Sequence, residues 1–467
     1  MATFHPPNDL QKTRRRPSWR RYQDRLHRTG RWRLVRRKQW LWLLIPALAA
    51  AAYWIIVARS SAIDSWGSTP RKPLAPSPQT ETLFSKADIR NLLAGHPTSD
   101  ILEGPFNIRF GDRSLRVEST IAADLQHYLQ KQLYRRTSRY IAIVVLNPIN
   151  GHVLAMVGYD KNGREPTPCL TSRFPAASLF KIVTAAAALE ECGYTRQSSL
   201  TFNGAKHTLY KSQLKDVRNR YTRHTTLAES FAQSINPVFG KIGRHCLGRE
   251  KLQRYADRFG FDRTIEFGLD LPPSRTRITD EPYQWAEIAS GFNHQTVISP
   301  LHGAILAAVA PAEGRLVEPT IIGRVTDQDG NELYHPAPTS SPPAVSPATA
   351  RELARLMQRT VTHGTARKIF RRMLKDKVLS RLTIGGKTGS IDTRDHGARY
   401  DWFVGFADGP DRGDAIAVSV LVAHEKYIGR RAGEYARRAI REYFRQRFEQ
   451  AERAGGIEPK AEGNPLT

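Results

Sequence analysis

Residues 174–193 read FPAASLFKIVTAAAALEECG, and the rest of the chain is organised around this stretch. Its apolar residues repeat at intervals of three and four positions, which predicts a buried helix of about sixteen residues that ends at Gly193. Ser178 and Lys181 stand three positions apart in the first turn, so their side chains share one face. Because burial lowers the pKa of a lysine, the amine could serve as the base for a serine nucleophile. The alternative interpretation is an ordinary amphipathic helix.

The Ser-x-x-Lys pattern is short, and it occurs a second time at Ser212 and Lys215. The residues around this copy, KHTLYKSQLKDVRNR, are polar and basic, and no apolar helical stripe follows them. Nothing in such a segment would bury a lysine and lower its pKa. The sequence context therefore favours Ser178 over Ser212 as the nucleophile.

The front of the chain carries much of its positive charge. The formal net charge is +27, and residues 1–38 hold 13 Lys and Arg against Asp9 and Asp24. A basic arm with tryptophans could bind nucleic acid, but the next segment offers a better explanation. Residues 39–58, QWLWLLIPALAAAAYWIIVA, contain no charged side chain and are long enough to cross a bilayer as a helix. A buried core helix and a cleaved signal peptide are the alternatives.

These features predict a protein anchored in the cell membrane by a single helix, with no nucleic-acid partner. By the positive-inside rule, the basic arm stays in the cytoplasm and everything after residue 60 lies outside it. Residues 59–80 are rich in Pro, Ser and Thr and are typical of an extended linker. Residues 81–116 predict a small pedestal of unknown role. The whole chain has 467 residues, and 40% of them are hydrophobic, which is enough to bury a sizeable core in the part that follows residue 116.

Apolar patterns predict strands near both ends of the remaining chain. The predicted strands are residues 140–146, 152–159, 402–407 and 415–423. The first two flank NPING, whose Asn150-Gly151 suits a hairpin turn. The stripe Ile121, Leu125, Leu129 and Leu133 predicts a helix of about fifteen residues, which Ser119 and Thr120 could cap. Another helix is expected near the end of the chain, with the apolar stripe Ala436, Ile440, Phe444 and Phe448. The pattern predicts an antiparallel sheet with outer layers from both chain ends and a helical insertion between them.

Two further motifs lie in settings that suit a cleft. Ser234-Ile235-Asn236 falls between two short helical patterns, so it is expected in a helix-to-helix loop, although a helix cap is the simpler interpretation. Lys387-Thr388-Gly389-Ser390 lies in LTIGGKTGSID, where the glycines indicate a strand that another backbone approaches closely. A phosphate-binding loop would need a glycine where Arg381 stands, so nucleotide binding is not indicated.

Ser-x-x-Lys, Ser-x-Asn and Lys-Thr-Gly, in this order, resemble the motifs of the penicillin-binding proteins and serine β-lactamases. The resemblance covers about residues 117–446 and extends to the strand hairpin, to His363-Gly364-Thr365-Ala366 and to DWFVGFA at 401–407. It implies a transpeptidase domain at 117–449 and a disordered tail at 450–467. The fold it implies is α+β: a five-stranded antiparallel sheet flanked by helices from both chain ends, plus an all-helical subdomain, with the active site between them.

The resemblance also implies a role for each matching residue. Ser178 would be the nucleophile, Lys181 its base, and Ser234 the group that passes a proton to the leaving amine. Asn236 would hold Lys181 and the substrate amide, and Lys387 would orient Ser234 and offset the charge of the substrate carboxylate. Thr388 and Ser390 would donate hydrogen bonds to that carboxylate, and Gly389 would leave room for the substrate strand. Backbone N–H groups of Ser178 and Ser390 would form the oxyanion hole, which is worth roughly 3 to 4 kcal/mol per donor in other acyl-transfer enzymes.

The implied reaction is the cross-linking of peptidoglycan stem peptides through a serine acyl-enzyme, inhibited by β-lactams. No cofactor or metal is expected, because the fourteen histidines show no zinc-ligand spacing. The stretch between the predicted membrane helix and the domain is too short for a glycosyltransferase module, so a separate membrane glycosyltransferase is a plausible partner. At 290–293 the chain reads SGFN where many relatives have Gly-Gln-Gly, which leaves the substrate preference open.

Three other activities remain compatible with the sequence. A D,D-carboxypeptidase or a β-lactamase would use the same motifs, and a β-lactam-binding sensor or cell-wall assembly scaffold would use the same fold without turnover. The basic arm at 1–38 is the best support for a scaffold.

Cys169, Cys192 and Cys246 are an odd count in a compartment that permits disulfides. Cys192 ends the nucleophile helix, and Cys246 ends the helix after Ser-x-Asn. If these two helices pack side by side, Cys192 and Cys246 can form the one internal bridge. Three buried free thiols are the alternative.

Overall fold

The computed structural model describes residues 84–164, 167–336, 342–393, 397–411 and 413–454. The predicted cytoplasmic arm (1–38), membrane helix (39–58) and linker (59–80) lie outside these residues, so they stay predictions. Among the residues that are described, no helix combines the length and the apolar character needed to cross a membrane.

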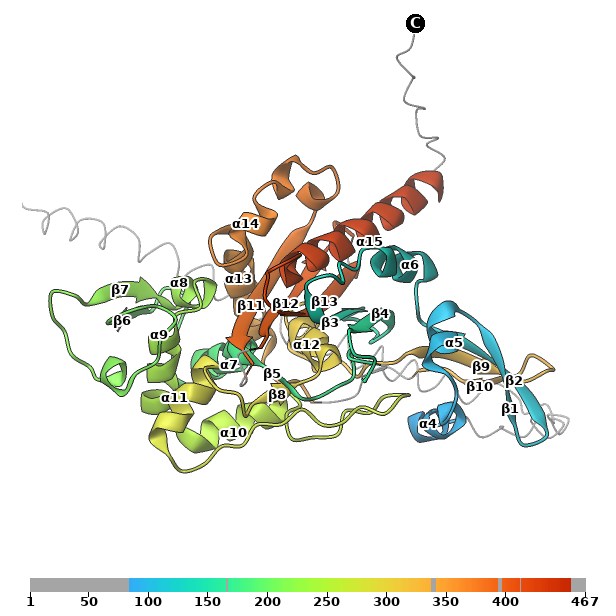
Figure 1. The fold of residues 1–467 in the computed structure, drawn as a ribbon, viewed down its shortest axis with the longest axis horizontal. Helices are drawn as coiled ribbons and strands as arrows, with labels where there is room; N and C mark the ends of the chain where they lie inside the picture. The colour runs from blue at the N-terminus through green and yellow to red at the C-terminus, as the bar shows by residue number, and fades with distance from the viewer. Residues whose placement is uncertain (1–83, 165–166, 337–341, 394–396, 412, 455–467) are drawn as a thin grey trace, which may run out of the picture. The chain divides into compact units, whose positions relative to one another are not determined.

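A five-stranded antiparallel sheet lies at the centre of the fold (Figure 1). Its strand order is β11-β12-β13-β3-β4, so strands from the two ends of the domain meet where β13 pairs with β3. The strands are β3 (Ser138–Leu146), β4 (Val153–Asp160), β11 (Thr383–Asp392), β12 (Arg399–Asp408) and β13 (Ala415–His424). All ten residues of β13 are buried, because helices cover both faces of the sheet. The predicted five-stranded antiparallel sheet is confirmed.

Helices from both chain ends cover one face of this sheet. They are α6 (Ala123–Lys131) and α15 (Ala432–Ala454), and the predicted stripe of α15 is buried against the strands. The helix α6 is shorter than predicted and has no side-chain cap, because the Thr120 hydroxyl instead donates to the carbonyls of Val153 and Thr320. The helix α15 continues to Ala454, beyond the expected start of the disordered tail at residue 450; residues 455–467 lie outside the described chain.

The other face of the sheet carries the helices that build the candidate site. The helix α12 (Pro300–Ala308) packs on β3, β12 and β13, and α13 (Pro347–Thr362) packs on β11. Around them lie α7 (Lys181–Glu191), α8 (Leu227–Ala232), α9 (Asn236–Lys241), α10 (Gly248–Arg258) and α11 (Pro282–Ser290). The short helix α14 (Arg367–Phe370) follows α13 and packs instead with α15, in the apolar layer on the first face.

The expected all-helical subdomain also contains strands, which corrects that expectation. The strands β6 (Ser199–Phe202) and β7 (Arg223–Thr226) form an antiparallel pair beside α8 and α9, and β5 (Phe174–Pro175) pairs with β8 (Val297–Ile298). Threonines and an aromatic residue in β6 and β7 favour extended backbone, and the pairing satisfies their N–H and C=O groups.

The pedestal predicted at 81–116 extends further along the chain. It holds α4 (Lys86–Leu93), α5 (Thr98–Glu103), β1 (Phe106–Phe110) and β2 (Arg113–Ser119). The strands β9 (Ile322–Thr326) and β10 (Glu332–Tyr334), from a much later part of the chain, complete a sheet of order β1-β2-β9-β10. They supply apolar partners for β2, since Val117 is paired with Val325 and both are fully buried.

The disulfide between Cys192 and Cys246 is present, and the two Cα atoms lie 6.2 Å apart. It joins the end of α7 to the π-helical turn Ile242–Leu247 that follows α9. Cys169 is free and buried, and burial raises the pKa of its thiol to about 12. The predicted bridge is confirmed.

Candidate active site

Ser178 lies in a tight turn at the start of the predicted nucleophile helix. This helix is not one continuous α-helix of sixteen residues: β5 leads into a 3-10 turn, Ala177–Phe180, and the α-helix α7 begins only at Lys181. Ala177 adopts a left-handed φ of 48°, which is costly for a residue with a side chain. The backbone is thus held in an uncommon conformation directly before the serine, as functional sites often require.

Lys181 is fully buried and contacts three acceptors. Its Nζ lies 2.9 Å from Ser178 Oγ and 2.8 Å from Asn236 Oδ1, and it also donates to the carbonyl oxygen of Ser290. Burial, and next the charge of Lys387, hold the pKa of Lys181 well below its usual value. A neutral amine can donate two hydrogens to Asn236 and Ser290 and keep its lone pair for the Ser178 proton. The arrangement can therefore deprotonate the serine.

Lys387 is the second fully buried lysine of the site. Its Nζ donates to Ser234 Oγ at 3.0 Å and to the carbonyl of Thr388 at 2.9 Å. Burial lowers the pKa of Lys387 to about 7, so the amine changes charge near neutral pH. Ser234 itself has a left-handed φ of 56° in the loop between α8 and α9. The contact with Lys387 can orient the Ser234 hydroxyl for proton transfer.

Asn236 connects the two halves of the site. Its side-chain oxygen faces Lys181, and its Nδ2 donates to the carbonyl of His207 at 2.9 Å. Its backbone N–H donates to the carbonyl of Lys206 at 2.7 Å. The segment between β6 and β7 therefore fixes the amide, and with it the position of the Lys181 amine.

The edge strand β11 forms the wall of the site opposite Asn236. A Cβ atom on Gly389 would lie 3.4 Å from the Ser178 nitrogen, so the strand passes directly beside the nucleophile. Thr388 Oγ1 lies 2.5 Å from Thr365 Oγ1, and Ser390 Oγ accepts from Arg399 at 3.3 Å. Both hydroxyls are thereby held at the edge of the sheet, where a ligand can add as a further strand.

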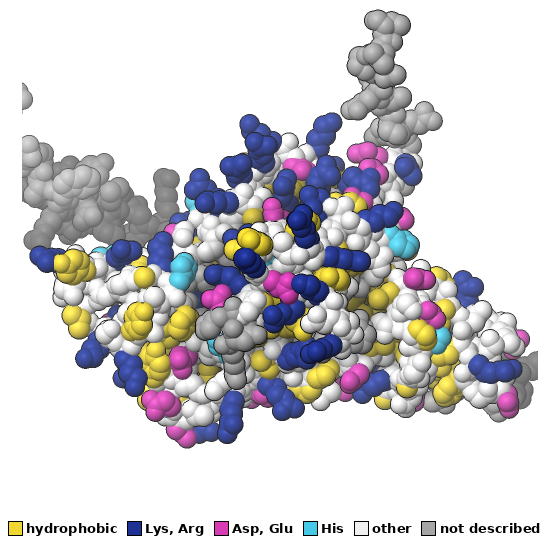
Figure 2. All heavy atoms as spheres, in the orientation of Figure 1, with side chains coloured by type: hydrophobic (Ala, Val, Ile, Leu, Met, Phe, Trp, Pro, Cys, Tyr) yellow, Lys and Arg dark blue, Asp and Glu magenta, His cyan; other side chains and the backbone are white. Residues whose placement is uncertain are grey.

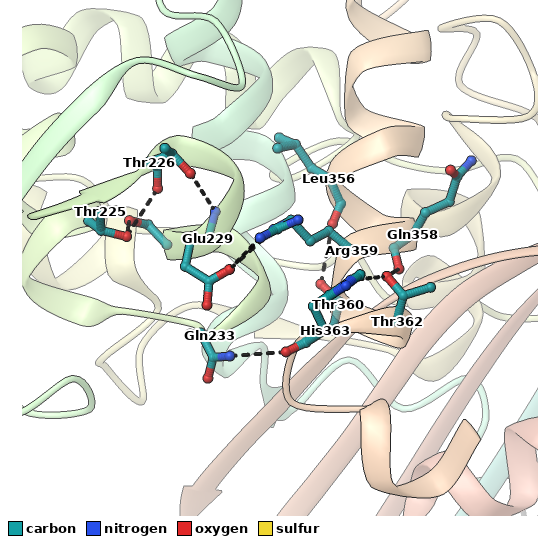
Figure 3. A network of polar contacts seen from close by, with 11 residues as sticks. Thr225, Thr226, Glu229, Gln233, Leu356, Gln358, Arg359, Thr360, Thr362 and His363 are labelled. Atoms are coloured by element: carbon teal, nitrogen blue, oxygen red, sulfur yellow. Dashed lines mark hydrogen bonds and ion pairs between the residues drawn. The ribbon is translucent and has the colours of Figure 1, made fainter. Parts of the chain in front are cut away.

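A polar network ties the Ser234 loop to the segment that carries Thr365 (Figure 3). The Arg359 side chain from α13 pairs with Glu229 of α8 at 3.0 Å, and Gln233 donates to the carbonyl of His363 at 3.1 Å. Thr226 caps α8 by accepting from the Glu229 N–H. These contacts set the spacing between α8 and α13, and so between the two sides of the cleft.

The site opens into a cleft of about 1180 Å³ that contains Ser178, Ser234 and Asn236 in its lining. The same cleft is lined by Thr388, Gly389 and Ser390, so sequence positions more than 200 residues apart meet there. A family model described as "Penicillin binding protein transpeptidase domain" matches residues 141–443. The chain belongs to the penicillin-binding protein transpeptidase family.

Comparison with known proteins agrees with this assignment. The chain is 23% identical over 330 residues to stage V sporulation protein D of Bacillus subtilis, a match that covers 66% of this chain and 49% of the relative. It is 27% identical over 335 residues to peptidoglycan D,D-transpeptidase PbpA of Mycolicibacterium smegmatis, covering 60% of this chain and 61% of the relative. The chain thus spans about half to three fifths of the length of these relatives.

Solved structures of transpeptidase domains share the fold. One is the D,D-transpeptidase domain of a peptidoglycan glycosyltransferase from Eggerthella lenta, with a TM-score of 0.56, 22% identity, and coverage of 73% of this chain and 84% of that one. Another is penicillin-binding protein A from M. tuberculosis in its ceftriaxone acyl-enzyme complex, with a TM-score of 0.57, 23% identity, and coverage of 70% and 79%. At these identities the likeness shows the fold.

The structure brings together every site residue expected of a transpeptidase-family member, and it leaves the second Ser-x-x-Lys copy outside. Ser212 and Lys215 are exposed on the segment between β6 and β7. Among the described residues, no group of three His, Cys, Asp or Glu could hold a metal ion.

Sequence reasoning missed several members of the site. Ser290 contributes a backbone carbonyl, which no side-chain pattern reveals, and His207 lines the cleft without belonging to a motif. Gly291 is required because a Cβ atom there would lie 1.8 Å from the carbonyl oxygen of Ala177. Residues 290–293 differ from the Gly-Gln-Gly of many relatives, but this difference did not predict that Ser290 would accept a hydrogen bond from Lys181.

Proposed function

We propose that the chain is a peptidoglycan D,D-transpeptidase that cross-links stem peptides through an acyl-enzyme on Ser178. The observation that carries the proposal is the buried Lys181 amine, 2.9 Å from Ser178 Oγ and with a lowered pKa. Two of the relatives are named as enzymes of this activity, in Mycolicibacterium smegmatis and Mycobacterium tuberculosis.

Acylation begins when Ser178 Oγ attacks the carbonyl carbon between the two terminal D-alanines of a donor stem peptide. The hydroxyl proton passes to Lys181, and the oxyanion is held by the backbone N–H groups of Ser178 and Ser390. The C–N bond then breaks, and the leaving D-alanine amine receives a proton through the Ser234 hydroxyl. Lys387 holds that hydroxyl in place at 3.0 Å.

Recognition of the donor uses the groups along β11. Lys387, when protonated, offsets the charge of the terminal carboxylate, and the hydroxyls of Thr388 and Ser390 donate hydrogen bonds to it. Asn236 holds the substrate amide while it keeps Lys181 in position. Gly389 leaves room for the substrate backbone beside the strand.

Deacylation reverses the roles of the same groups. The side-chain amine of a second stem peptide attacks the ester carbonyl and loses a proton to the base, and the Ser178 oxygen leaves and is reprotonated. The products are one new peptide bond between two stem peptides and free enzyme. A β-lactam inhibits because its ring opens onto Ser178 while the leaving nitrogen stays attached to the acyl group.

The proposed location is the cell membrane, with the catalytic domain outside the cytoplasm. The uncharged segment 39–58 and the basic residues before it support a single anchor with a cytoplasmic N-terminus. The Cys192–Cys246 disulfide supports an oxidising compartment for the domain. A membrane glycosyltransferase would supply the glycan strands.

Mass spectrometry of the purified protein after incubation with benzylpenicillin tests the proposal. We expect one acyl group on Ser178, none in Ser178→Ala and none on Ser212. Lys181→Ala should slow acylation by roughly 10²- to 10⁴-fold, the usual loss when a general base is removed. Acylation that persists in Ser178→Ala would refute the assignment of the nucleophile.

A donor and an acceptor stem-peptide mimic, supplied together, separate the competing activities. Transpeptidation yields the joined peptide, whereas a carboxypeptidase releases D-alanine without joining. Rapid turnover of a chromogenic cephalosporin would indicate a β-lactamase, and stable acylation with no reaction of paired peptides would indicate a sensor or scaffold.

A further inference from the structure

A basic surface lies next to the cleft, on the segment that follows β6 and on the start of β7. Residues 203–224 contain six Lys and Arg and a single acidic residue, Asp216. Five of the six cations are exposed: Lys211, Lys215, Arg218, Arg220 and Arg223. In Figure 2 the dark blue and yellow side chains gather together over the part of the molecule where Figure 1 places β6 and β7.

The charge of this surface is not neutralised by the protein. Asp216 is paired with Lys241 of α9 at 3.0 Å, and this contact lowers the pKa of the aspartate. Within the described part of the chain, none of the five exposed cations forms a salt bridge. Arg220 and Arg223 instead lie over the rings of Tyr221 and Phe202, at 4.8 and 5.9 Å from the ring centres. A surface of this kind favours an anionic ligand.

Two exposed aromatic side chains accompany the charges. Tyr210 and Tyr221 are 61% and 65% exposed, among the highest values for large hydrophobic side chains in the described chain. An exposed tyrosine presents a flat apolar face with a polar edge. Such a face suits the apolar side of a sugar ring, so the surface combines contacts for sugars with contacts for carboxylates.

The segment is a built platform. The buried Gln213 side chain donates to the carbonyls of Asn203 and Ala205 and accepts from the Tyr210 N–H. Leu209 and Leu214 pack beneath it against Ala286 of α11. Asn203 Nδ2 also donates to the Val217 carbonyl, and the Tyr221 N–H donates to Asn219 Oδ1, so the backbone that carries the exposed side chains is held along its length.

The platform continues directly into the cleft. The carbonyls of Lys206 and His207 hold Asn236, and His207 lines the cleft itself. A polymer bound on the platform would therefore present its attached groups close to Ser178. Holding the polymer there raises the effective concentration of its peptides at the site.

We propose that residues 203–224 bind the glycan strand of peptidoglycan outside the cleft, through its sugars and the free carboxylates of neighbouring stem peptides. This proposal rests on the proposed transpeptidase function and names the polymer, in addition to the single peptide, as the substrate. A membrane surface with anionic lipids would satisfy the cations, but it would not explain why the platform is joined to the cleft.

The test compares two triple variants of the full-length protein purified in mild detergent. Arg218→Gln/Arg220→Gln/Arg223→Gln removes three platform charges. Arg371→Gln/Arg372→Gln/Lys375→Gln is the matched control, because these three side chains are also exposed, form no salt bridge within the described chain and are absent from the cleft lining. Binding is measured by cosedimentation with purified peptidoglycan sacculi over a range of salt concentrations.

We expect the platform variant to bind sacculi roughly 3- to 30-fold more weakly at low salt, with a shallower salt dependence, and the control to change by less than about 2-fold. Tyr221→Ala should weaken binding at high salt as well, because stacking is not screened. Sacculi whose carboxylates have been converted to amides should bind the wild type and the platform variant alike.

Three outcomes would overturn the proposal. They are equal losses in the platform and control variants, no loss in either, and a loss of binding to anionic vesicles without a loss on sacculi. Acylation by benzylpenicillin, which needs only the cleft, should stay within about 2-fold of wild type in the platform variant. If the wild type itself is not acylated, the proposed function fails, independently of the sacculus measurement.

Discussion

Replacing Gly291 by alanine should disable the nucleophile without unfolding the protein. Gly291 has a left-handed φ of 66°, and an added Cβ would lie 1.8 Å from the Ala177 carbonyl oxygen and 3.0 Å from the Ser178 nitrogen. To reach an ordinary contact of 3.4 Å, the oxygen would have to move by about 1.6 Å, and the 3-10 turn with Ser178 would move with it. A misplacement of about 1 Å in a catalytic group can reduce the rate by about 100-fold. We therefore expect acylation to slow by at least about 100-fold.

Gly163→Ala separates the effect of this clash from that of backbone strain. Gly163 has a similar φ of 63°, but an added Cβ there would meet no atom of the described chain within 4 Å. Both variants should lose roughly 1–2 kcal/mol of unfolding free energy from the left-handed backbone, with a further loss in Gly291→Ala for the displaced turn. Stopped-flow acylation with a fluorescent penicillin and thermal melting would measure the two effects. Equal acylation rates in both variants would refute the argument.

Three other predictions follow from the site and the chain. Because burial lowers the pKa of Lys387 to about 7, its amine is charged below that pH and neutral above it, so the pre-acylation affinity for carboxylate-bearing penicillins should weaken from pH 6 to 9. In Lys387→Met the affinity measured by stopped-flow titration should depend little on pH. A variant that keeps the pH profile of the wild type would contradict this prediction. The disulfide joins residues 54 positions apart, and a cross-link of this kind restricts the unfolded chain. Cys192→Ser/Cys246→Ser should therefore lower the free energy of unfolding in urea by roughly 2–4 kcal/mol and leave acylation at 25 °C intact. An unchanged midpoint of urea unfolding would count against this prediction. Alkaline phosphatase fused after residue 460 should be active, and a fluorescent cytoplasmic reporter there would reverse the proposed topology.

Local patterns were sufficient to predict an antiparallel sheet built from both chain ends and the pair Ser178 and Lys181, whereas the rest of the site came from the resemblance to a known family. The strands β3 and β13 are apolar over most of their length, and the stripe of α15 repeats with helical spacing, so the strands and the helix could be predicted from neighbouring residues. Ser178 and Lys181 stand together because they are one turn apart. The order of the three motifs then indicated which distant segments meet.

What the sequence did not predict depends on contacts between distant backbones. Ala177 has a left-handed backbone, and its carbonyl oxygen lies so close to Gly291 that an added Cβ atom there would be 1.8 Å from it; neither residue has a side chain that signals this approach. The acceptor at Ser290 is a carbonyl group. Thr120 was expected to cap a helix, but its hydroxyl donates instead to the backbone carbonyls of Val153 and Thr320, and Thr320 is 200 residues away in the sequence.

The pedestal sheet also restricts how this protein can change over evolutionary time. The strands β1 and β2 precede the catalytic core in the chain, whereas β9 and β10 are encoded about 200 codons later, beyond the nucleophile. A gene fragment that began at residue 117 would encode β9 and β10 without β1 and most of β2, and would leave strand edges open to pairing with other chains. A single crossover between related genes at a point between β2 and β9 would instead pair halves of the sheet that come from different parents. The pedestal cannot be exchanged as a cassette and must be inherited together with the serine that it accompanies.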